Sequence, residues 1–552
     1  MRPDPPQLRR ASLLSSLTSF LSAGKDRDGA TYATVGVRAT VVFILAAATL
    51  WYFYTSIHWQ LMVDSPIMHY VKFLMDHGRQ PYTDITDNNM PGAYYTESWA
   101  MQIFGGGDVG WRIYEYFLLV ALTVTLTVIA KSYDWLAGFF AGGLFIVVHA
   151  AEGPKYSGER ELVLTVLLLL GYAALFAGVR RRQPILMLLF GVVSGLSVSI
   201  KPTFLPLPFA LAVILIFVLR RKSISIWPYL GWIFVGFLSV MALNVGFLLQ
   251  HHAVDSFVFV LTTVSPTYAV LARYGFWQLA SLSLPTYIPL LLLLAIVTAA
   301  VNWRERLSWT WEQWALAVGV LFGWASFMVQ GKPFLHHRYT YLVLLFLLLG
   351  FELFNALRRS KWPQIAAVIA LGFTLLWVVP REMRSVLHIA RQMPAGQTAF
   401  TLNLQEDLQR LGPADLQDKV QCFDLVYGCL NALYHLNILE NTSYTGDLLL
   451  FTNLQGPAID YYKNKYWDLE RRDPCEVIVM SNEWFQQRNN FDKVELWPEF
   501  AAFLHQNFTL VRERFAVGQG DDPKNPDGYR IYIRNGSPLL QKAAAIQEFQ
   551  AM

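Results

Sequence analysis

The sequence has few charged residues, and this scarcity narrows the classes of protein it can form. Asp, Glu, Lys and Arg make up 15% of the 552 residues, whereas hydrophobic residues make up 54%. Soluble domains carry about 25% charged residues, so the composition excludes an ordinary soluble multidomain protein and predicts a polytopic membrane protein. The net charge of +4 says little about partners by itself, because in membrane proteins the positions of Lys and Arg matter more than their total. We expect no nucleic-acid partner.

Cysteine is also scarce, with three residues in the whole chain: Cys422, Cys429 and Cys475. Their spacing matches no zinc-binding pattern, so buried or weakly reactive thiols are favoured over a metal site. A disulfide between Cys422 and Cys429 stays open if that region faces an oxidising compartment. The chain also lacks a phosphate-binding glycine loop and an internal repeat.

Long apolar runs, by contrast, are abundant. The runs suited to crossing a membrane are residues 39–59, 113–129, 135–148, 162–179, 184–200, 203–219, 226–249, 285–301, 314–329, 339–357 and 365–379. The third is short for a span of about 20 residues. These runs predict a bundle of about eleven transmembrane helices.

Basic clusters follow alternate spans and therefore predict the topology. They comprise residues 180–182, 220–222, 304 with 306, and 358, 359 and 361, and the N-terminal segment adds Arg9, Arg10, Lys25 and Arg27. Because cytoplasmic loops are enriched in Lys and Arg, we expect the N-terminus in the cytoplasm and, with an odd number of helices, the C-terminal region outside. Residues 1–38 are then a cytoplasmic segment, whose helically spaced leucines and Phe20 predict an amphipathic helix on the membrane surface.

The composition becomes mixed and soluble beyond Pro380. We expect residues 39–380 to form the membrane domain and residues 381–552 an external α/β domain. Strands are predicted at 419–423, 476–480, 510–515 and 529–534, and helices at 407–411, 430–436 and 498–507. The predicted fold class is mainly α, a polytopic membrane helix bundle with a C-terminal soluble α/β domain.

The first external loop, residues 61–112, is the most informative part of the chain. Ser65 and Pro66 form a helix start and His77-Gly78 a helix stop, which predicts an amphipathic helix on the outer membrane surface. Asp64 lies just before it, where a carboxylate interacts well with the helix dipole. A purely structural interpretation is that Asp64 only caps this helix. Pro91 opens a second predicted helix that ends near Gly105.

The same loop resembles a known family. Three stretches are similar to the first periplasmic loop of bacterial GT-C-type glycosyltransferases: DSPIMHY from Asp64, DHGRQPYTDITDNNMPGAYY from Asp76 and IFG from Ile103. That group includes dolichyl-phosphate-mannose protein mannosyltransferases and lipid A aminoarabinose transferases. In it, an aspartate just after the first membrane helix acts on the acceptor, and Asp64 occupies that position. Many bacterial members have a lysine where this chain has Asn88 and Asn89.

The resemblance implies an inverting glycosyltransferase of the bacterial inner membrane, with its C-terminal domain periplasmic or extracellular. It implies a polyprenyl-phosphate-linked hexose or pentose as donor, membrane lipid around the enzyme, and Asp64 as base. The acceptor stays open as a glycan, a lipid or a protein. Sugar transfer needs a base near the nucleophile and stabilisation of the departing phosphate. The candidates for acceptor or metal binding are Asp84, Asp87, Glu159 and Glu161. The candidates for phosphate binding are Lys201, Arg273, Lys332, His336, His337 and Arg338.

No cofactor is required by the spacing, although carboxylates from separate loops suit Mg²⁺ or Mn²⁺. Each acid could instead belong to a charged helix start, and each cation could contact lipid headgroups. The alternative function is a transporter or flippase of lipid-linked saccharide, which predicts ionisable residues in mid-helix and repeat symmetry. In a third interpretation the external domain carries the function and the helices only anchor it. The acids gather in outer loops, which favours chemistry at the membrane surface.

Overall fold

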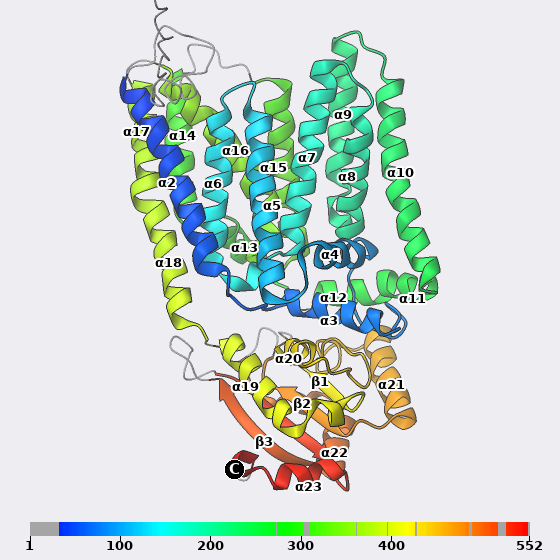
Figure 1. Ribbon diagram of the computed structural model, residues 1–552. Helices are drawn as coiled ribbons and strands as arrows, with labels where there is room; N and C mark the ends of the chain where they lie inside the picture. Colours follow the sequence, from blue (N-terminus) through cyan, green and yellow to red (C-terminus); the bar gives the residue numbers. More distant parts are fainter. Residues whose placement is uncertain are drawn as a thin grey trace, which may run out of the picture.

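In the computed structural model, a bundle of long helices carries a smaller α/β part at one end (Figure 1). The structure describes residues 32–271, 273–302, 309–359, 362–394, 396–425, 428–484, 488–516 and 526–549. The predicted N-terminal surface helix, the N-terminal basic residues, Arg304, Arg306 and Lys361 lie outside the described residues.

Nine helices in the described part of the chain are long and apolar enough to cross a membrane. They are α2 (Tyr32–Ser56), α5 (Gly107–Ala130), α6 (Trp135–Glu152), α7 (Arg160–Arg181), the run Pro202–Arg221 that contains α9 (Pro206–Arg221), α10 (Trp227–Gln250), α15 (Trp311–Gln330), α16 (Tyr339–Leu357), and the run Trp362–Leu411 that begins with α17 (Trp362–Phe373) and α18 (Val379–Gln392). Two apolar helices of 15 residues, α8 (Leu186–Ile200) and α14 (Ile288–Asn302), pack against them. All the predicted apolar runs are therefore helical.

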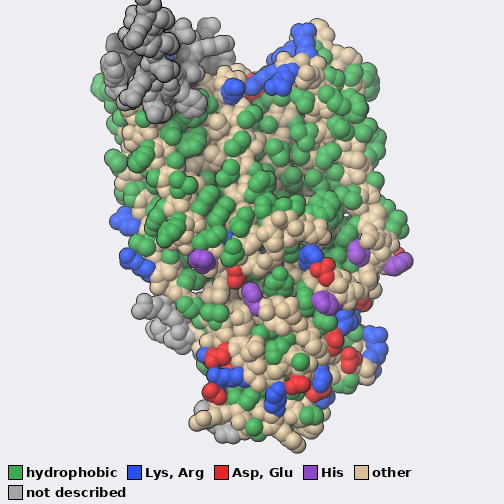
Figure 2. Space-filling model, in the orientation of Figure 1, with side chains coloured by type: hydrophobic (Ala, Val, Ile, Leu, Met, Phe, Trp, Pro, Cys, Tyr) green, Lys and Arg blue, Asp and Glu red, His purple; other side chains and the backbone are tan. Residues whose placement is uncertain are grey.

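The helices pack closely where small residues allow it. A Cβ added at Gly191 of α8 would lie 2.2 Å from the Ile233 carbonyl oxygen, and one at Gly236 of α10 would lie 2.3 Å from the Leu188 oxygen. Such small-residue contacts drive helix association in lipid. On the outside, large apolar side chains such as Trp227 remain exposed, and green side chains cover the flank of the bundle in Figure 2. This exposed apolar surface is what a lipid environment requires.

The C-terminal part contains a four-stranded mixed sheet in the order β1-β2-β4-β3. β1 (Val420–Phe423) is parallel to β2 (Val477–Ser481), and β4 (Asp527–Arg534) is antiparallel to both β2 and β3 (Phe508–Ala516). The accompanying helices are α19 (Gly396–Leu411), α20 (Gly428–Leu436), α21 (Pro457–Arg472), α22 (Pro498–Asn507) and α23 (Pro538–Ala544). Every predicted strand is present, whereas α21 was not predicted.

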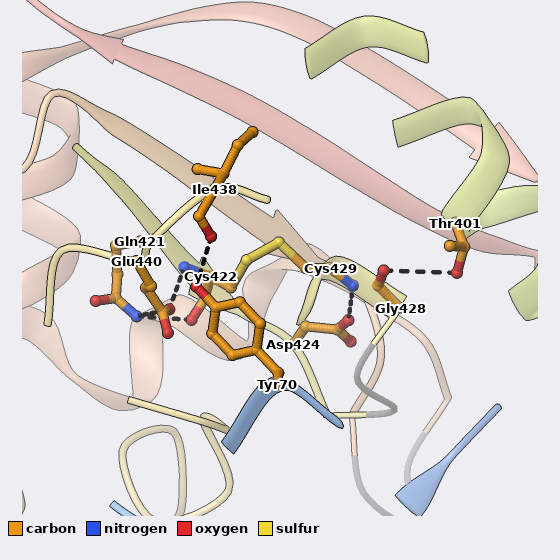
Figure 3. The surroundings of a disulfide bond; sticks show 9 residues. All are labelled: Tyr70, Thr401, Gln421, Cys422, Asp424, Gly428, Cys429, Ile438 and Glu440. Atoms are coloured by element: carbon orange, nitrogen blue, oxygen red, sulfur yellow. Dashed lines mark hydrogen bonds between the residues drawn. A yellow bond between two sulfur atoms is a disulfide. The ribbon is translucent and has the colours of Figure 1, made fainter. Parts of the chain in front are cut away.

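A disulfide joins the end of β1 to the start of α20. Cys422 and Cys429 are bonded, with Cα atoms 6.0 Å apart, while Cys475 is a buried free cysteine. Figure 3 shows that Tyr70 of the first loop points toward this region, where its hydroxyl donates to the Ile438 carbonyl at 3.0 Å. The possible Cys422–Cys429 pairing is thus confirmed.

Helices α3 (Asp64–Asp76) and α4 (Pro91–Phe104) lie between the bundle and the C-terminal part (Figure 1). Both were predicted, but α3 does not lie on an open membrane surface. Its side chains from Ser65 to Val71 are buried, because α20, which belongs to the C-terminal part of the chain, packs against α3. The basic clusters that end α7 and α9 lie at the opposite end of the bundle from the C-terminal part.

Candidate functional site

A cavity of about 550 Å³ lies where α3, the start of α7, the end of α8 and the C-terminal part meet. We call it the interface cavity. Its acidic, basic and histidine lining residues are Asp64, Asp87, Arg160, Glu161, Lys201, Lys332, His336 and His337. The C-terminal part contributes Leu425, Tyr444, Thr445, Gly446, Leu448, Leu449, Leu450 and Tyr462. The cavity therefore has a charged wall from the bundle and first loop, and an uncharged wall from the C-terminal part.

Asp64 begins α3 and faces the start of α7. The N-cap of α3 is Val63, which has φ 57° and makes no side-chain capping bond, so Asp64 is not the helix cap. Instead, Asp64 Oδ2 accepts a hydrogen bond from Arg160 Nη2 at 2.9 Å. A β-branched residue with positive φ is strained, and such strain gathers at functional sites. Val63 itself lines the interface cavity.

Arg160 was not among the sequence candidates, yet it joins two acids. Besides Asp64, its Nε lies 3.8 Å from Glu97 Oε1 of α4. Burial, and then the nearby Asp87, Asp64 and Glu161 carboxylates, raise the pKa of Glu97 to about 8, although Arg160 opposes this shift. The signal for Arg160 in the sequence is weak, since its flanking glutamates make it look like part of a charged helix start.

Glu159 and Glu161 flank Arg160 but have different partners. Glu159 is buried, and its Oε1 has no hydrogen-bond partner among the described residues. Burial and the neighbouring Asp64 carboxylate raise the pKa of Glu159 well above its usual range. Glu161 pairs with Lys201. Its two carboxylate oxygens lie 3.6 Å from His336 Nε2 and 3.3 Å from His337 Nε2.

Lys332 supplies a further cation on the cavity wall. Its side chain is 2% exposed, and its ammonium donates to the Tyr268 carbonyl at 3.1 Å and to the Leu271 carbonyl. Burial lowers the pKa of Lys332 to about 8, and the nearby Arg273 guanidinium adds to the shift. Of the phosphate candidates, Lys201, Lys332, His336 and His337 thus line one cavity.

Three sequence candidates lie elsewhere. Arg338 is paired with Glu152, and Arg273 is exposed and donates to the Val329 carbonyl at 3.4 Å; neither lines the interface cavity. Asp84 accepts from the Gln80 amide at 2.8 Å within its own turn and is also absent from the lining. The basic cluster from Lys332 to Arg338 therefore divides, because successive side chains on a 3₁₀ turn point in different directions.

Asp87 lines the cavity but is already well bonded. It accepts from the Asn89 side chain at 2.8 Å and from the Tyr94 hydroxyl at 2.9 Å. Thr86, next to it, accepts two hydrogen bonds from Thr445 of the C-terminal part, one to its hydroxyl from the Thr445 amide and one to its carbonyl from the Thr445 hydroxyl. Asp87 therefore helps to fix the loop against the C-terminal wall.

Two groups of ligand atoms in the described residues are compact enough to hold a metal ion. Asp64, Glu159 and His336 form one group, and Glu161, His336 and His337 form the other, with ligand atoms within 4.8 Å of one another in each. The unpartnered Glu159 oxygen belongs to the first group. Carboxylate and imidazole ligands together suit Mn²⁺ better than Mg²⁺, which prefers oxygen.

Comparison with known proteins identifies the fold. No family model and no curated protein sequence matches the chain. Among solved structures, ArnT from Cupriavidus metallidurans bound to undecaprenyl phosphate is similar with a TM-score of 0.52 and 11% identity, covering 90% of this chain and 98% of that chain. The Archaeoglobus fulgidus oligosaccharyltransferase tethered to an acceptor peptide has a TM-score of 0.50 and 11% identity, covering 93% and 78%.

These likenesses extend over the bundle and the C-terminal part together. At such identities they establish the fold and leave the chemistry to the residues of the site. They confirm the fold class that the first loop implied. The chain is a multi-pass membrane protein with the fold of the GT-C-type glycosyltransferases.

Proposed function

We propose that this protein is a glycosyltransferase that moves a sugar from a polyprenyl-phosphate donor to an acceptor at the membrane surface. One observation carries the proposal: the interface cavity combines the Asp64 carboxylate with the cationic groups of Arg160, Lys201 and Lys332. A base and an anion-binding wall within one enclosed space are what direct sugar transfer requires. The similarity to a fold that binds undecaprenyl phosphate in ArnT supports the donor class.

In the proposed reaction, the acceptor oxygen or nitrogen forms a bond to the anomeric carbon of the sugar. The bond from that carbon to the phosphate oxygen breaks, and its electron pair stays on the phosphate. The acceptor proton passes to the Asp64 carboxylate. A single displacement of this kind inverts the anomeric configuration. Lys201 and Lys332, with His336 and His337, would stabilise the departing phosphate by charge-assisted hydrogen bonds.

A divalent metal fits the acidic wall of the cavity. The Asp64, Glu159 and His336 group would hold it, and the cation would offset the repulsion between two adjacent carboxylates. When bound, the metal would supply Lewis-acid stabilisation of a phosphate or acceptor oxygen. Of the two ions that the sequence suggested, Mn²⁺ fits better than Mg²⁺, because Mg²⁺ is bound by oxygen and one of the three ligands is an imidazole.

We also propose that the interface cavity faces the periplasm or cell exterior of a bacterial inner membrane. The basic clusters that end α7 and α9 support this orientation, because they lie at the opposite end of the bundle and Lys and Arg are enriched on the cytoplasmic side. The disulfide in the C-terminal part agrees, since disulfides persist in oxidising compartments.

The test is sugar transfer and donor hydrolysis by purified protein in lipid nanodiscs, with a panel of radiolabelled polyprenyl-phosphate sugars. Asp64→Asn keeps the size of the side chain and removes the base, so we expect a rate loss of about 10² to 10⁴-fold. The matched control is Asp76→Asn on the same helix, where the carboxylate is exposed and paired with Lys72; it should keep the wild-type rate.

Equal rates for wild type and Asp64→Asn would contradict the assignment of the base. Donor binding without turnover by the wild-type protein would favour the transporter or flippase instead, and vesicle translocation of the same donors would then decide between them.

A further inference from the structure

The first two turns of α5 hold the backbone that leads into Asp64. Asp108 Oδ1 accepts from the Leu61 amide at 2.7 Å. Arg112 donates from Nε to the Trp59 carbonyl and from Nη2 to the Gln60 carbonyl, both at 3.2 Å. These carbonyls belong to the connection between α2 and α3, so α5 determines where α3 begins.

The same two turns hold a second backbone, residues 153–158 between α6 and α7. Arg112 Nη2 also donates to the Pro154 carbonyl at 3.4 Å. Trp111 Nε1 donates to the Ser157 carbonyl at 3.0 Å, and the Ser157 hydroxyl donates to Glu115 Oε2 at 2.6 Å. The residues that follow directly are Glu159, Arg160 and Glu161.

The two backbones are also joined to each other. The Ser65 hydroxyl, next to Asp64, donates to the Ser157 carbonyl at 3.0 Å and accepts from Trp111 Nε1 at 3.1 Å. Gly158 has φ +60°, and a Cβ there would lie 2.4 Å from Trp111 Nε1. The indole therefore fills the junction between the two segments.

Both carboxylate oxygens of Glu115 have hydrogen-bond partners among the described residues. Its Oε1 accepts from the Tyr52 hydroxyl at 2.8 Å and lies 2.5 Å from His149 Nε2. Arg112 Nη1 donates to its Oε2 at 2.9 Å. The side chains of Arg112 and Glu115 are fully buried. Fully bonded polar networks of this kind are rigid, and ionised groups buried in a membrane bundle are costly unless they serve a function.

We propose that Trp111, Arg112 and Glu115, which we call the α5 brace, are positioning residues that fix Asp64 relative to Glu159, Arg160 and Glu161. The inference rests on the proposed function, since sugar transfer is the reaction it serves. None of the three lines the interface cavity, so they act through the residues they hold. The 2.9 Å contact between Asp64 and Arg160 joins segments 96 residues apart in the chain. Hydrogen bonds of this network tie the backbones of the two segments together next to that contact.

The kinetic test uses small changes that keep the charges in place. Trp111→Phe removes the indole donor, and Ser65→Ala removes the hydroxyl beside Asp64. We expect each to lower kcat at least tenfold, because catalysis is steeply sensitive to the placement of reacting groups. Affinity for undecaprenyl phosphate should stay within twofold. Ser65→Thr keeps the hydroxyl and should recover most of the rate.

The control is Ser197→Ala, which removes another buried hydroxyl, one that donates to the Val193 carbonyl within its own helix. It should leave kcat unchanged. Wild-type kcat in both Trp111→Phe and Ser65→Ala would overturn the proposal. So would an equal loss of kcat in Ser197→Ala, or a loss in the two variants that matches only their loss of folded, monodisperse protein.

A second measurement does not depend on activity. Hydrogen–deuterium exchange in nanodiscs should be at least tenfold faster in Trp111→Phe than in wild type for the amides of residues 61–67 and 157–163, with no change in the C-terminal sheet. Unchanged exchange in both segments would overturn the proposal even where the rates fall. If the wild-type protein transfers no sugar, the proposed function fails, and faster exchange in these two segments alone still supports the brace.

Discussion

Binding of a polyprenyl phosphate to the interface cavity should weaken as the pH rises through about 8. Burial lowers the pKa of Lys332 to about 8, and burial raises the pKa of Glu97 to about 8. Between pH 7 and pH 9 the cavity wall therefore loses the positive charge of Lys332, and Glu97, which lies beside Arg160 but does not line the cavity, gains a negative charge. Both changes disfavour an anion.

The magnitude follows from the fraction of Lys332 that is protonated. A group with a pKa of about 8 is about 90% protonated at pH 7 and about 10% at pH 9, so a ligand that binds the charged form loses about tenfold in affinity, or about 1.4 kcal/mol. Two unit charges 4 Å apart attract by about 4 kcal/mol at an effective dielectric constant of 20, which is enough for such selectivity. Phosphate monoesters lose their second proton near pH 6, so the ligand's charge changes little over this range.

The assay is equilibrium binding of radiolabelled undecaprenyl phosphate to protein in nanodiscs at constant ionic strength. Lys332→Arg stays charged at every pH tested, so its binding curve should be flatter than that of wild type and keep only the contribution of Glu97. The exposed Lys155 provides the control, since Lys155→Arg should keep the wild-type pH dependence. A change of less than twofold in wild-type affinity between pH 7 and pH 9 would refute this reasoning, as would an unaltered curve for Lys332→Arg.

Three further results are expected. Glu97→Gln should lose less thermal stability than wild type between pH 6 and pH 9. Folding raises the pKa of Glu97 to about 8, so the contribution of Glu97 to the unfolding free energy is full below its unfolded pKa and is lost as the pH rises through 8. Parallel plots of melting temperature against pH for the two proteins would contradict this. Removing the disulfide with Cys422→Ser and Cys429→Ser should lower the unfolding free energy by about 2 to 3 kcal/mol, the loop-closure entropy expected for a sequence separation of 7. A reductant should lower the melting temperature of the wild-type protein but not that of the double variant. Glu159→Gln should weaken Mn²⁺ binding at least tenfold, measured by electron paramagnetic resonance. Glu476→Gln, which changes a glutamate directly before β2 in the C-terminal part, should leave it unchanged.

In the first loop, local structure could be predicted from the sequence, but the surroundings of the helices could not. Pro91 correctly predicted where α4 begins, and Ser65 with Pro66 predicted the start of α3 to within two residues, because helix starts depend on a few neighbouring residues. The same reasoning placed α3 on an open membrane surface, where the structure has α20 packed against it. Contacts between α3 and a helix more than 350 residues later leave no local pattern.

The cationic candidates show the same limit. Lys332 and Arg338 belong to one short basic stretch, yet Lys332 lines the interface cavity and Arg338 pairs with Glu152. Arg160, which the sequence suggested only as a charged neighbour of two glutamates, makes the direct contact with Asp64. Residue type told us that cations were available near the outer helix ends, but not which of them face the base.

By itself, the sequence determined that the chain forms a membrane helix bundle with a small α/β part, and that an acidic loop follows the first span. The length of apolar runs, the alternation of residues in strands and the signals at helix ends are local properties of the sequence. They can therefore be recognised without knowledge of the fold. The tertiary structure alone decided that Asp64, Arg160, Glu161, Lys201 and Lys332 share one cavity, and that α5 braces the two segments beside it. Those distances depend on how helices far apart in the chain pack against one another, and packing is a property of the whole chain.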